Sequence, residues 1–518
     1  MRSHPHPPSN RRIREESSSV QRSTQGVIPK ARAFTSGTRD LPCIPLLGDP
    51  SFRLKNGCTR DDTREATPRH SSRLLHYAAM ERPARRLPRF FVWLLPLSFL
   101  LQIAAIGILH QYRTRPGNDN FEFGWEMGRI GRSIAQGQGF SSPYEGNTGP
   151  TAWEPPLYPF LIGGVFKIFG VYTRASAWVL LSINSVFATL TCIPIFFIAR
   201  RTFGESIAKW SAYAWGLNPY VWYWSIHWIW DTTFTPFILA CIFLLSLELA
   251  GAGTNGIQSG VPRVSPNLRD PGLPLWGLFG AIFGIGALAN PTMLTFLPFC
   301  GLWIWRQRFR RGLSSLSGVI VASALFWTAL SPWLVRNYEV FGRFVFIRDD
   351  FGLQFRLGNW KGADGMLMAY LQPNLNRGEL AKFQQMGELA YAEACKREAF
   401  AWVQENPERF AVISMKRMFY YWNGVPRATG SVSPVDFRTS GFLATSVLAL
   451  WGLVRAVHQK RPGAWLFALL VLTYPTTYYF VFPHARYRHP IEPELVIVAV
   501  FLISEAIRSQ RSEVRMPK

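Results

Sequence analysis

Long apolar stretches recur along this chain of 518 residues, and they constrain its fold more than any other feature of the sequence. A stretch of about 20 apolar residues is long enough to cross the hydrocarbon core of a bilayer as a helix. Charged residues make up only 17% of the chain, against about 25% in soluble domains. We therefore expect an all-α polytopic membrane protein, which excludes a cytosolic enzyme, a secreted disulfide scaffold and a fibrous chain.

Ten segments are candidate transmembrane helices. They are residues 90–109, 175–199, 207–225, 232–250, 273–289, 292–305, 314–334, 441–457, 464–482 and 491–507. With the N-terminal side of the first segment inside, the short basic loops between them all fall on the cytoplasmic side, as the positive-inside rule requires. This threading places three regions on the extracytoplasmic side: the first outer loop 111–174, the segment 335–440 and the turn 483–490.

The net charge of +24 does not indicate nucleic-acid binding. Residues 1–89 hold 18 Lys and Arg against 8 Asp and Glu, and many of the other basic residues stand beside apolar segments. We interpret residues 1–79 as a disordered basic tail, because they have too few apolar residues to offset the entropy of ordering. A transit peptide and a translation start at Met80 are alternatives. The remaining regions are a transmembrane core (80–334), an extracytoplasmic helical segment (335–440) and C-terminal transmembrane helices with a cytoplasmic tail (441–518).

Shorter helices are expected outside the bilayer core. Residues 121–135 repeat apolar side chains at helical spacing with Glu and Arg between them, which predicts an amphipathic helix at the membrane surface. Residues 156–170 are apolar but too short to span, so we expect a second juxtamembrane helix. Residues 379–406 read as one helix, ended by Asn406-Pro407 before a second helix toward Trp422. Together these form a small extracytoplasmic cap.

Three acidic residues in the first outer loop are candidates for chemistry: Glu122, Glu126 and Glu154. Glu122 and Glu126 are four residues apart, so both lie on one face of the predicted helix. A carboxylate held at the membrane surface can accept a proton from a hydroxyl group as a general base. The alternative is the ordinary polar face of an amphipathic helix.

Arg486 and Arg488 lie in the short outer turn, against the positive-inside trend. Guanidinium groups at headgroup depth are suited to bind a lipid phosphate, because they offer planar bidentate donors. Anchors at the membrane interface, or ion pairs with the acids that follow, are the alternative. His489 beside them is a weaker candidate for substrate binding, since a structural role is the usual one.

Asp231 begins a predicted span, directly after the aromatic run 222–230. It can bind substrate, although a helix N-cap is the more ordinary role of an acid there. Asn290, Arg336 and the pair 349–350 are weaker candidates. The six cysteines form no metal or disulfide pattern, and we find no phosphate-binding loop, nucleophile elbow or zinc motif.

Four motifs occur in a recognisable order. They are EFGWEMGRIGRSIAQGQGFSSP at 122–143, TGPTAWEPPLYP at 148–159, RMFYYW at 417–422 and RYRHPIEP at 486–493. Over roughly residues 80–510 the chain resembles bacterial membrane glycosyltransferases of the GT-C class. Within that class it is similar to the dolichyl-phosphate-mannose protein mannosyltransferase and aminoarabinose transferase relatives. Glu122 and Glu126 straddle the family's acidic position, and Glu154 stands where aminoarabinose transferases often have a basic residue.

The resemblance implies a GT-C-like fold and transfer of a sugar from a polyprenyl-phosphate donor to a glycan, lipid or protein acceptor outside the cytoplasm. It implies that Glu126 or Glu122 is the base, and that Arg486 and Arg488 hold the lipid phosphate. Glu154, Tyr158, Asp231 and His489 complete the substrate-binding candidates. No cofactor is certain, although a divalent metal ion can take part. The alternatives are a multi-pass transporter or flippase of lipid-linked glycans, and a non-catalytic assembly protein.

Overall fold

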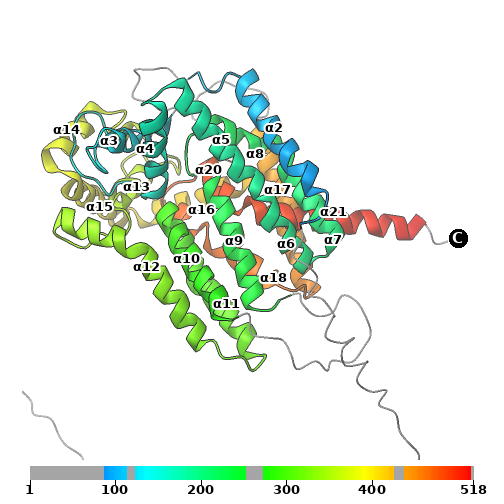
Figure 1. Cartoon of the computed structure of the whole chain (residues 1–518). Coiled ribbons are helices and arrows are strands. Elements are labelled where there is room, and N and C mark those ends of the chain that lie inside the picture. The colour runs from blue at the N-terminus through cyan, green and yellow to red at the C-terminus, as the bar shows by residue number, and fades with distance from the viewer. Residues whose placement is uncertain (1–86, 114–122, 253–271, 425–436, 515–518) are drawn as a thin grey trace, which may run out of the picture. The chain divides into compact units, whose positions relative to one another are not determined.

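The computed structural model describes residues 87–113, 123–252, 272–424 and 437–514 (Figure 1). The chain divides into two units, Met1–Ala84 and Arg85–Lys518, and every described residue belongs to the second. The predictions for the tail 1–79 therefore lie outside the described residues. Within the described ranges every regular element is a helix, apart from an isolated bridge between Ser141 and Pro150. The predicted all-α class is confirmed.

Four helical segments are long and apolar enough to cross a membrane. They are α2 (Phe91–Ile108), Arg174–Thr202, α12 (Leu316–Phe341) and Gly441–His458 within α17 (Phe437–His458). Only 28% of the most apolar stretch of α2 and 22% of that of α12 is buried inside the protein. Because burying such helices in lipid instead of water is strongly favourable, this exposure indicates a multi-pass membrane protein.

The other predicted spans are helical but shorter or interrupted. The segment Arg174–Thr202 consists of α5 (Arg174–Leu190) and α6 (Cys192–Thr202), and the further elements are α7 (Glu205–Gly216), α8 (Pro219–His227), α9 (Phe234–Leu249), α10 (Leu273–Ala289), η2 (Pro291–Thr295), α11 (Leu297–Phe309), α18 (Ala464–Thr473), α19 (Thr476–Phe480) and α21 (Glu492–Val514). The predicted span 207–225 divides at Pro219, where Asn218 caps α8 by accepting a hydrogen bond from the Tyr220 amide at 2.9 Å. The count of ten spans stays a prediction.

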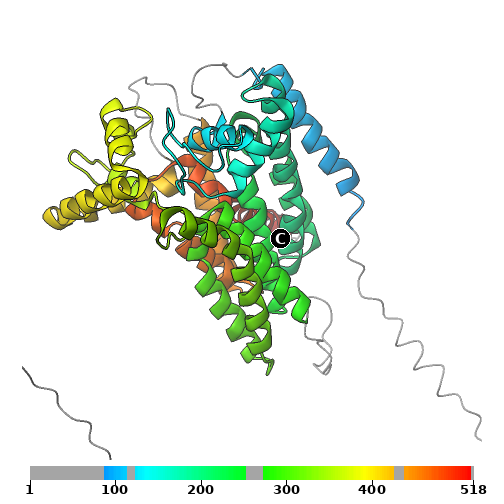
Figure 2. The same ribbon diagram turned by 60° about the vertical axis from the view of Figure 1, so that its left-hand side comes forward.

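The membrane helices share one large apolar core. In it the stacked rings of Phe203 and Phe501 lie 4.3 Å apart, which joins the N-terminal helices to α21. Figures 1 and 2 show α10 and α12 running side by side. These packed helices form a rigid base for the polar segments that follow.

The two helices predicted within residues 111–174 are present as α3 (Glu126–Ala135) and α4 (Leu157–Phe169), and their place at the membrane surface stays a prediction. They cross closely, because a Cβ atom added at Gly131 would lie 2.5 Å from Ile162 Cγ2. Only glycine permits so short a distance, which is why the two helices can cross in direct contact.

The segment 335–440 contributes α13 (Phe351–Gly358), η3 (Ala369–Leu371), α14 (Arg377–Met386), α15 (Glu388–Glu405) and α16 (Pro407–Asn423). The helix predicted over 379–406 is two helices, because Gly387 between them has a φ of 76° that breaks the α-helix. The predicted break at Asn406-Pro407 is present.

A second apolar core joins these outer helices to the first outer loop. Tyr144 and Trp153 of the loop pack against Phe383 of α14, with ring centroids 4.8 and 5.5 Å apart. Glu388 at the start of α15 accepts hydrogen bonds from the Ala152 amide at 2.6 Å and from the Thr151 hydroxyl. The loop that carries Glu154 is therefore held against α14 and α15.

Candidate active site

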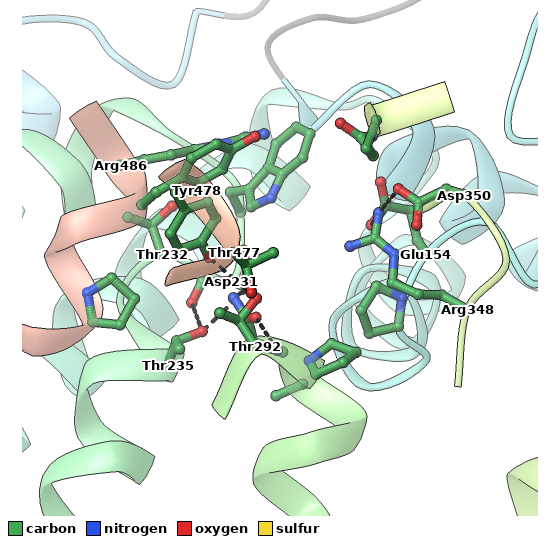
Figure 3. A pocket seen from close by; sticks show the side chains of 18 of the residues that line it. Glu154, Asp231, Thr232, Thr235, Thr292, Arg348, Asp350, Thr477, Tyr478 and Arg486 are labelled. Carbon is green, nitrogen blue, oxygen red and sulfur yellow. Dashed lines mark hydrogen bonds and ion pairs between the residues drawn. The ribbon is translucent and has the colours of Figure 1, made fainter. Parts of the chain in front are cut away.

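A cavity of about 320 Å³ opens where the outer loops meet the membrane helices. Its walls come from six separate stretches of chain, which are the start of α3, the loop before α4, the segment leading into α9, the turn between α10 and η2, the residues around α13, and the segment from α19 to η4 (His489–Ile491). Figure 3 labels several of its polar side chains, among them Glu154, Asp231, Thr232, Thr235, Thr292, Arg348, Asp350, Thr477, Tyr478 and Arg486. Residues far apart in the sequence thus line one cavity.

Arg486 supplies a positive charge on one wall. It lies in the short helix α20 (Ala485–Arg488), where its backbone amide donates to Nδ1 of His484 at 3.2 Å. Its guanidinium lies 4.0 Å from the centroid of the Trp230 ring, a cation–π contact that holds it in place. Among the described residues it forms no ion pair with a carboxylate, so its charge is available to bind an anion in the cavity.

Glu154, Arg348 and Asp350 form the opposite wall (Figure 3). Arg348 pairs with Asp350, and its Nη2 atom lies 3.6 Å from Oε2 of Glu154. Glu154 is buried, and it makes no hydrogen bond through its side chain within the part of the chain that the structure describes. Burial raises the pKa of Glu154 to about 8, and the nearby charges of Asp350 and Glu126 add to this.

Asp231 lies at the floor of the cavity, before α9. Its Oδ2 atom accepts hydrogen bonds from the Thr235 hydroxyl at 3.1 Å and from Asn290 Nδ2 at 3.3 Å. Burial raises the pKa of this carboxyl, while Arg486 opposes the shift. Asn290 reaches Asp231 because it ends α10 in an extended conformation, and its own Oδ1 caps η2.

Glu126 is buried at the first position of α3, behind the cavity. Its Oε1 accepts a hydrogen bond from Asn374 Nδ2 at 2.6 Å, and Arg129 donates to the other end of the same amide. Burial raises its pKa, against the influence of Arg129 and Arg486. The next residue, Met127, lines the cavity. Glu122 lies outside the described residues.

The structure does not bring Arg488, Tyr158 or His489 to the cavity. Arg488 is buried, where it donates to the backbone oxygens of Trp422 and Phe442 and pairs with Glu492 at 2.7 Å. The Tyr158 hydroxyl donates to Asn184 Oδ1 at 2.8 Å. His489 stacks on Trp215 with ring centroids 5.5 Å apart, and burial lowers its pKa to about 3. These three side chains support the packing around the site.

Arg348 and Tyr478 are cavity residues that sequence reasoning missed. Arg348 directly precedes two acids in an outer segment, and that cluster of charges is a signal that could have indicated it. Tyr478 lies in an aromatic stretch that reads as an ordinary membrane span, so no local signal distinguished it. Its hydroxyl donates to Thr292 at 3.2 Å across the cavity floor.

The residues described here do not fit a resident metal ion. No group of three or more His, Cys, Asp or Glu side chains within the described ranges is placed to hold one. Asp231 also faces Glu154 and Asp350 across the cavity and does not converge with them (Figure 3). Participation of a divalent metal ion stays a prediction, and no chemical step below depends on it.

No curated protein matches the sequence significantly. The structure is similar to the oligosaccharyltransferase AglB from Archaeoglobus fulgidus, in complex with an inhibitory peptide and a dolichol-phosphate, with 12% identity and a TM-score of 0.45. That match covers 83% of this chain and 52% of AglB, so the chain spans about half the length of that enzyme. It is also similar to ArnT from Cupriavidus metallidurans bound to undecaprenyl phosphate, with 13% identity, a TM-score of 0.32 and coverage of 80% and 77% of the two chains.

The family comparison matches a segment that contributes to one wall and to the floor of the cavity. Residues 153–254, which include Glu154 and Asp231, match the family model of the dolichyl-phosphate-mannose-protein mannosyltransferases. This match confirms the resemblance to GT-C class membrane glycosyltransferases that the sequence motifs indicated.

Proposed function

We propose that this protein is a membrane glycosyltransferase that moves a sugar from a polyprenyl-phosphate donor to an acceptor. The observation that carries the proposal is the cavity in which Arg486, without a carboxylate partner among the described residues, faces Glu154. An unpaired guanidinium beside a membrane is costly unless it binds an anion, and a lipid phosphate is the anion available there. The match of residues 153–254 to a family of mannosyltransferases that use a dolichyl-phosphate sugar supports the same reaction.

The proposed reaction needs one base and one site for the leaving phosphate. A carboxylate accepts the proton of the acceptor hydroxyl, whose oxygen attacks the anomeric carbon, and the bond from that carbon to the phosphate oxygen breaks. Arg486 stabilises the negative charge of the departing polyprenyl phosphate. Direct displacement inverts the anomeric centre.

The base is Glu126 or Glu122, the acids on the first juxtamembrane helix. Glu126 lies close enough to Glu154 and Arg486 to influence the charge of both. Its hydrogen bond from Asn374 holds the carboxylate in one orientation. Glu154 is a second candidate, because it lines the cavity and has an oxygen free of hydrogen bonds to described residues.

The resemblance to bacterial GT-C enzymes supports a place in the bacterial inner membrane, and the threading of the predicted spans supports a cavity on the extracytoplasmic side. The partners are then the polyprenyl-phosphate sugar, bilayer lipids and a glycan, lipid or protein acceptor. The alternative of a transporter is less favoured, because the polar candidates gather in one cavity beside the outer segments and no paired broken repeat is evident in the sequence.

The test is release of polyprenyl phosphate from polyprenyl-phosphate sugars by the full-length protein in lipid vesicles with cell-envelope acceptors. Arg486→Ala should raise the KM for the donor about 10- to 100-fold, because a hydrogen bond to a charged group contributes about 1.5–3 kcal/mol. Arg377→Ala, on an exposed position of α14, is the matched control and should leave the KM unchanged.

In the same assay, Glu126→Gln and Glu122→Gln, singly and together, decide which acid is the base. Loss of kcat with an unchanged donor affinity identifies it. Full transfer by the double variant and by Glu154→Gln would contradict the acid–base mechanism. Movement of the intact lipid-linked sugar across the bilayer without release of polyprenyl phosphate would favour the transporter instead.

A further inference from the structure

The floor of the cavity differs chemically from its two charged walls. It is formed by Asp231, Thr232 and Thr235 at the start of α9, by the turn Asn290–Thr292 and by Tyr478 (Figure 3). Apart from Asp231 and the ring of Pro291, these side chains carry hydroxyls and an amide. A compact ligand rich in hydroxyl groups would find both donors and acceptors there.

Asp231 is held with one carboxylate oxygen fixed and the other available. Both hydrogen bonds that it accepts, from Thr235 and Asn290, go to Oδ2. Its Oδ1 has no hydrogen-bond partner among the described residues, although the side chain is buried at the cavity floor. A carboxylate oxygen that borders the cavity can accept a hydrogen bond from a ligand.

Asp231 and Arg486 are also neighbours. The positive charge of Arg486 is the strongest of the influences that oppose the rise in the pKa of Asp231. If Arg486 holds the donor phosphate, the group attached to that phosphate lies beside Asp231. In a polyprenyl-phosphate sugar that group is the glycosyl ring.

The charges of the cavity limit what that ring can carry. Arg348 is already paired with Asp350, and Arg486 is the residue that we assign to the phosphate. Asp231 then remains as the acid at the floor, and an added carboxylate on the sugar would meet it without a free cation to compensate.

We infer that the floor around Asp231 is the subsite for the donor's glycosyl group, that Asp231 accepts hydrogen bonds from its hydroxyls, and that the subsite selects uncharged sugars over uronic acids. The inference rests on the proposed function and adds the chemical class of the donor sugar. Thr235 and Asn290 are positioning residues, because they fix the carboxylate through Oδ2.

Binding measurements on the full-length protein in nanodiscs separate this inference from the proposed function. Three ligands are compared: polyprenyl phosphate, polyprenyl-phosphate hexose and polyprenyl-phosphate hexuronate. Wild type should bind the hexose lipid about tenfold or more tightly than the hexuronate lipid. Asp231→Asn should weaken the hexose lipid about tenfold and leave polyprenyl phosphate unchanged, since the bare lipid does not reach the floor.

Asp364→Asn, an exposed acid in the outer segment, is the matched control and should change neither affinity. Thr232→Val keeps the shape of a floor residue, removes one hydroxyl and should weaken only the glycosylated lipids. If Asp231→Asn fails to fold, Thr232→Val tests the inference in its place.

Three results would overturn the inference. An equal loss for the bare and glycosylated lipids in both floor variants would give Asp231 and Thr232 a structural role. Equal affinity of wild type for hexose and hexuronate would remove the selectivity. If wild type binds none of the three lipids, the proposed function fails and the inference fails with it, whereas tight binding of bare polyprenyl phosphate preserves the proposed function.

Discussion

At the residue scale, Arg486 and Arg488 lie two positions apart in the sequence but have different surroundings in the structure. Arg486 projects into the cavity and stacks on Trp230, whereas Arg488 is buried among backbone oxygens and pairs with Glu492. In the sequence both are cations in the same short turn. The difference arises because α20 and η4 turn the chain, so that only the first side chain faces the chamber.

Glu154 is the residue whose charge depends most directly on its surroundings. Burial raises its pKa from the ordinary value of 4.5 to about 8. At pH values between these two pKa values, Glu154 holds a proton in the folded protein that it releases in the unfolded chain. The free energy of unfolding therefore decreases as the pH rises through this window, and the contribution is fully present below pH 4.5.

Glu154→Gln should flatten this pH dependence, because the amide resembles the protonated carboxyl at every pH. The measurement is the midpoint of thermal unfolding in detergent, followed by tryptophan fluorescence. Relative to wild type, the variant should gain about 2 °C or more between pH 4.5 and pH 8. Part of the decrease remains, because burial also raises the pKa of Asp349 to about 7.

The exposed Glu145 of the same loop provides the control for this experiment. Glu145→Gln should leave the profile of wild type unchanged. An identical slope in wild type and Glu154→Gln would show that Glu154 is ionised throughout the range, and its proposed share in the chemistry would then lose its physical basis.

At the scale of elements, the residues that lead into α3 position Glu126. Gly124 has a φ of 80°, and Trp125 also has a positive φ, of 46°. A Cβ atom added at Gly124 would lie 2.5 Å from the backbone oxygen of Ile229. This contact joins the start of α3 to the segment that carries Trp230 and Asp231.

Gly124→Ala should therefore destabilise the protein by about 2 kcal/mol or more, from backbone strain and overpacking together. It should also lower transfer activity, since the start of α3 must move away from residue 229. Thermal unfolding and the transfer assay measure the two effects. Gly164→Ala is the control, because a Cβ atom there meets nothing within 4 Å. Wild-type stability in Gly124→Ala would contradict the close approach.

The helix boundaries can be compared with those that the sequence predicted. Apolar length predicted α10 with its observed bounds, and the motif Pro155-Pro156 predicted the start of α4. The break at Gly387 and the division of the span 207–225 were not predicted. Both depend on local dihedral angles within stretches whose composition suits a continuous helix.

At the scale of the whole molecule, the cavity depends on the attachment of the segment 481–491 to the membrane helices. Arg488 provides this attachment: it donates to the backbone oxygens of Trp422 at the end of α16 and Phe442 of α17, to the Ser446 hydroxyl at 2.7 Å, and pairs with Glu492 of α21. One buried guanidinium thus connects three long helices next to α20.

Arg488→Ala should lower the stability by about 3–5 kcal/mol, because it leaves Glu492 buried without its partner. The double variant Arg488→Ala with Glu492→Ala should recover part of that loss. Thermal unfolding measures both. A fully stable Arg488→Ala variant with a raised donor KM would contradict the structural role and return Arg488 to the phosphate site.

The sequence by itself determined the membrane class, the positions of most helices, the family resemblance and the candidate residues Glu126, Glu154, Asp231 and Arg486. Apolar length, helical periodicity and short motifs are local properties, so they can be read without coordinates. Only the tertiary structure decided that Arg348 and Tyr478 belong to the cavity and that Arg488, Tyr158 and His489 do not. Which side chains share a chamber depends on how distant helices pack, and no local pattern encodes the direction in which each side chain finally points.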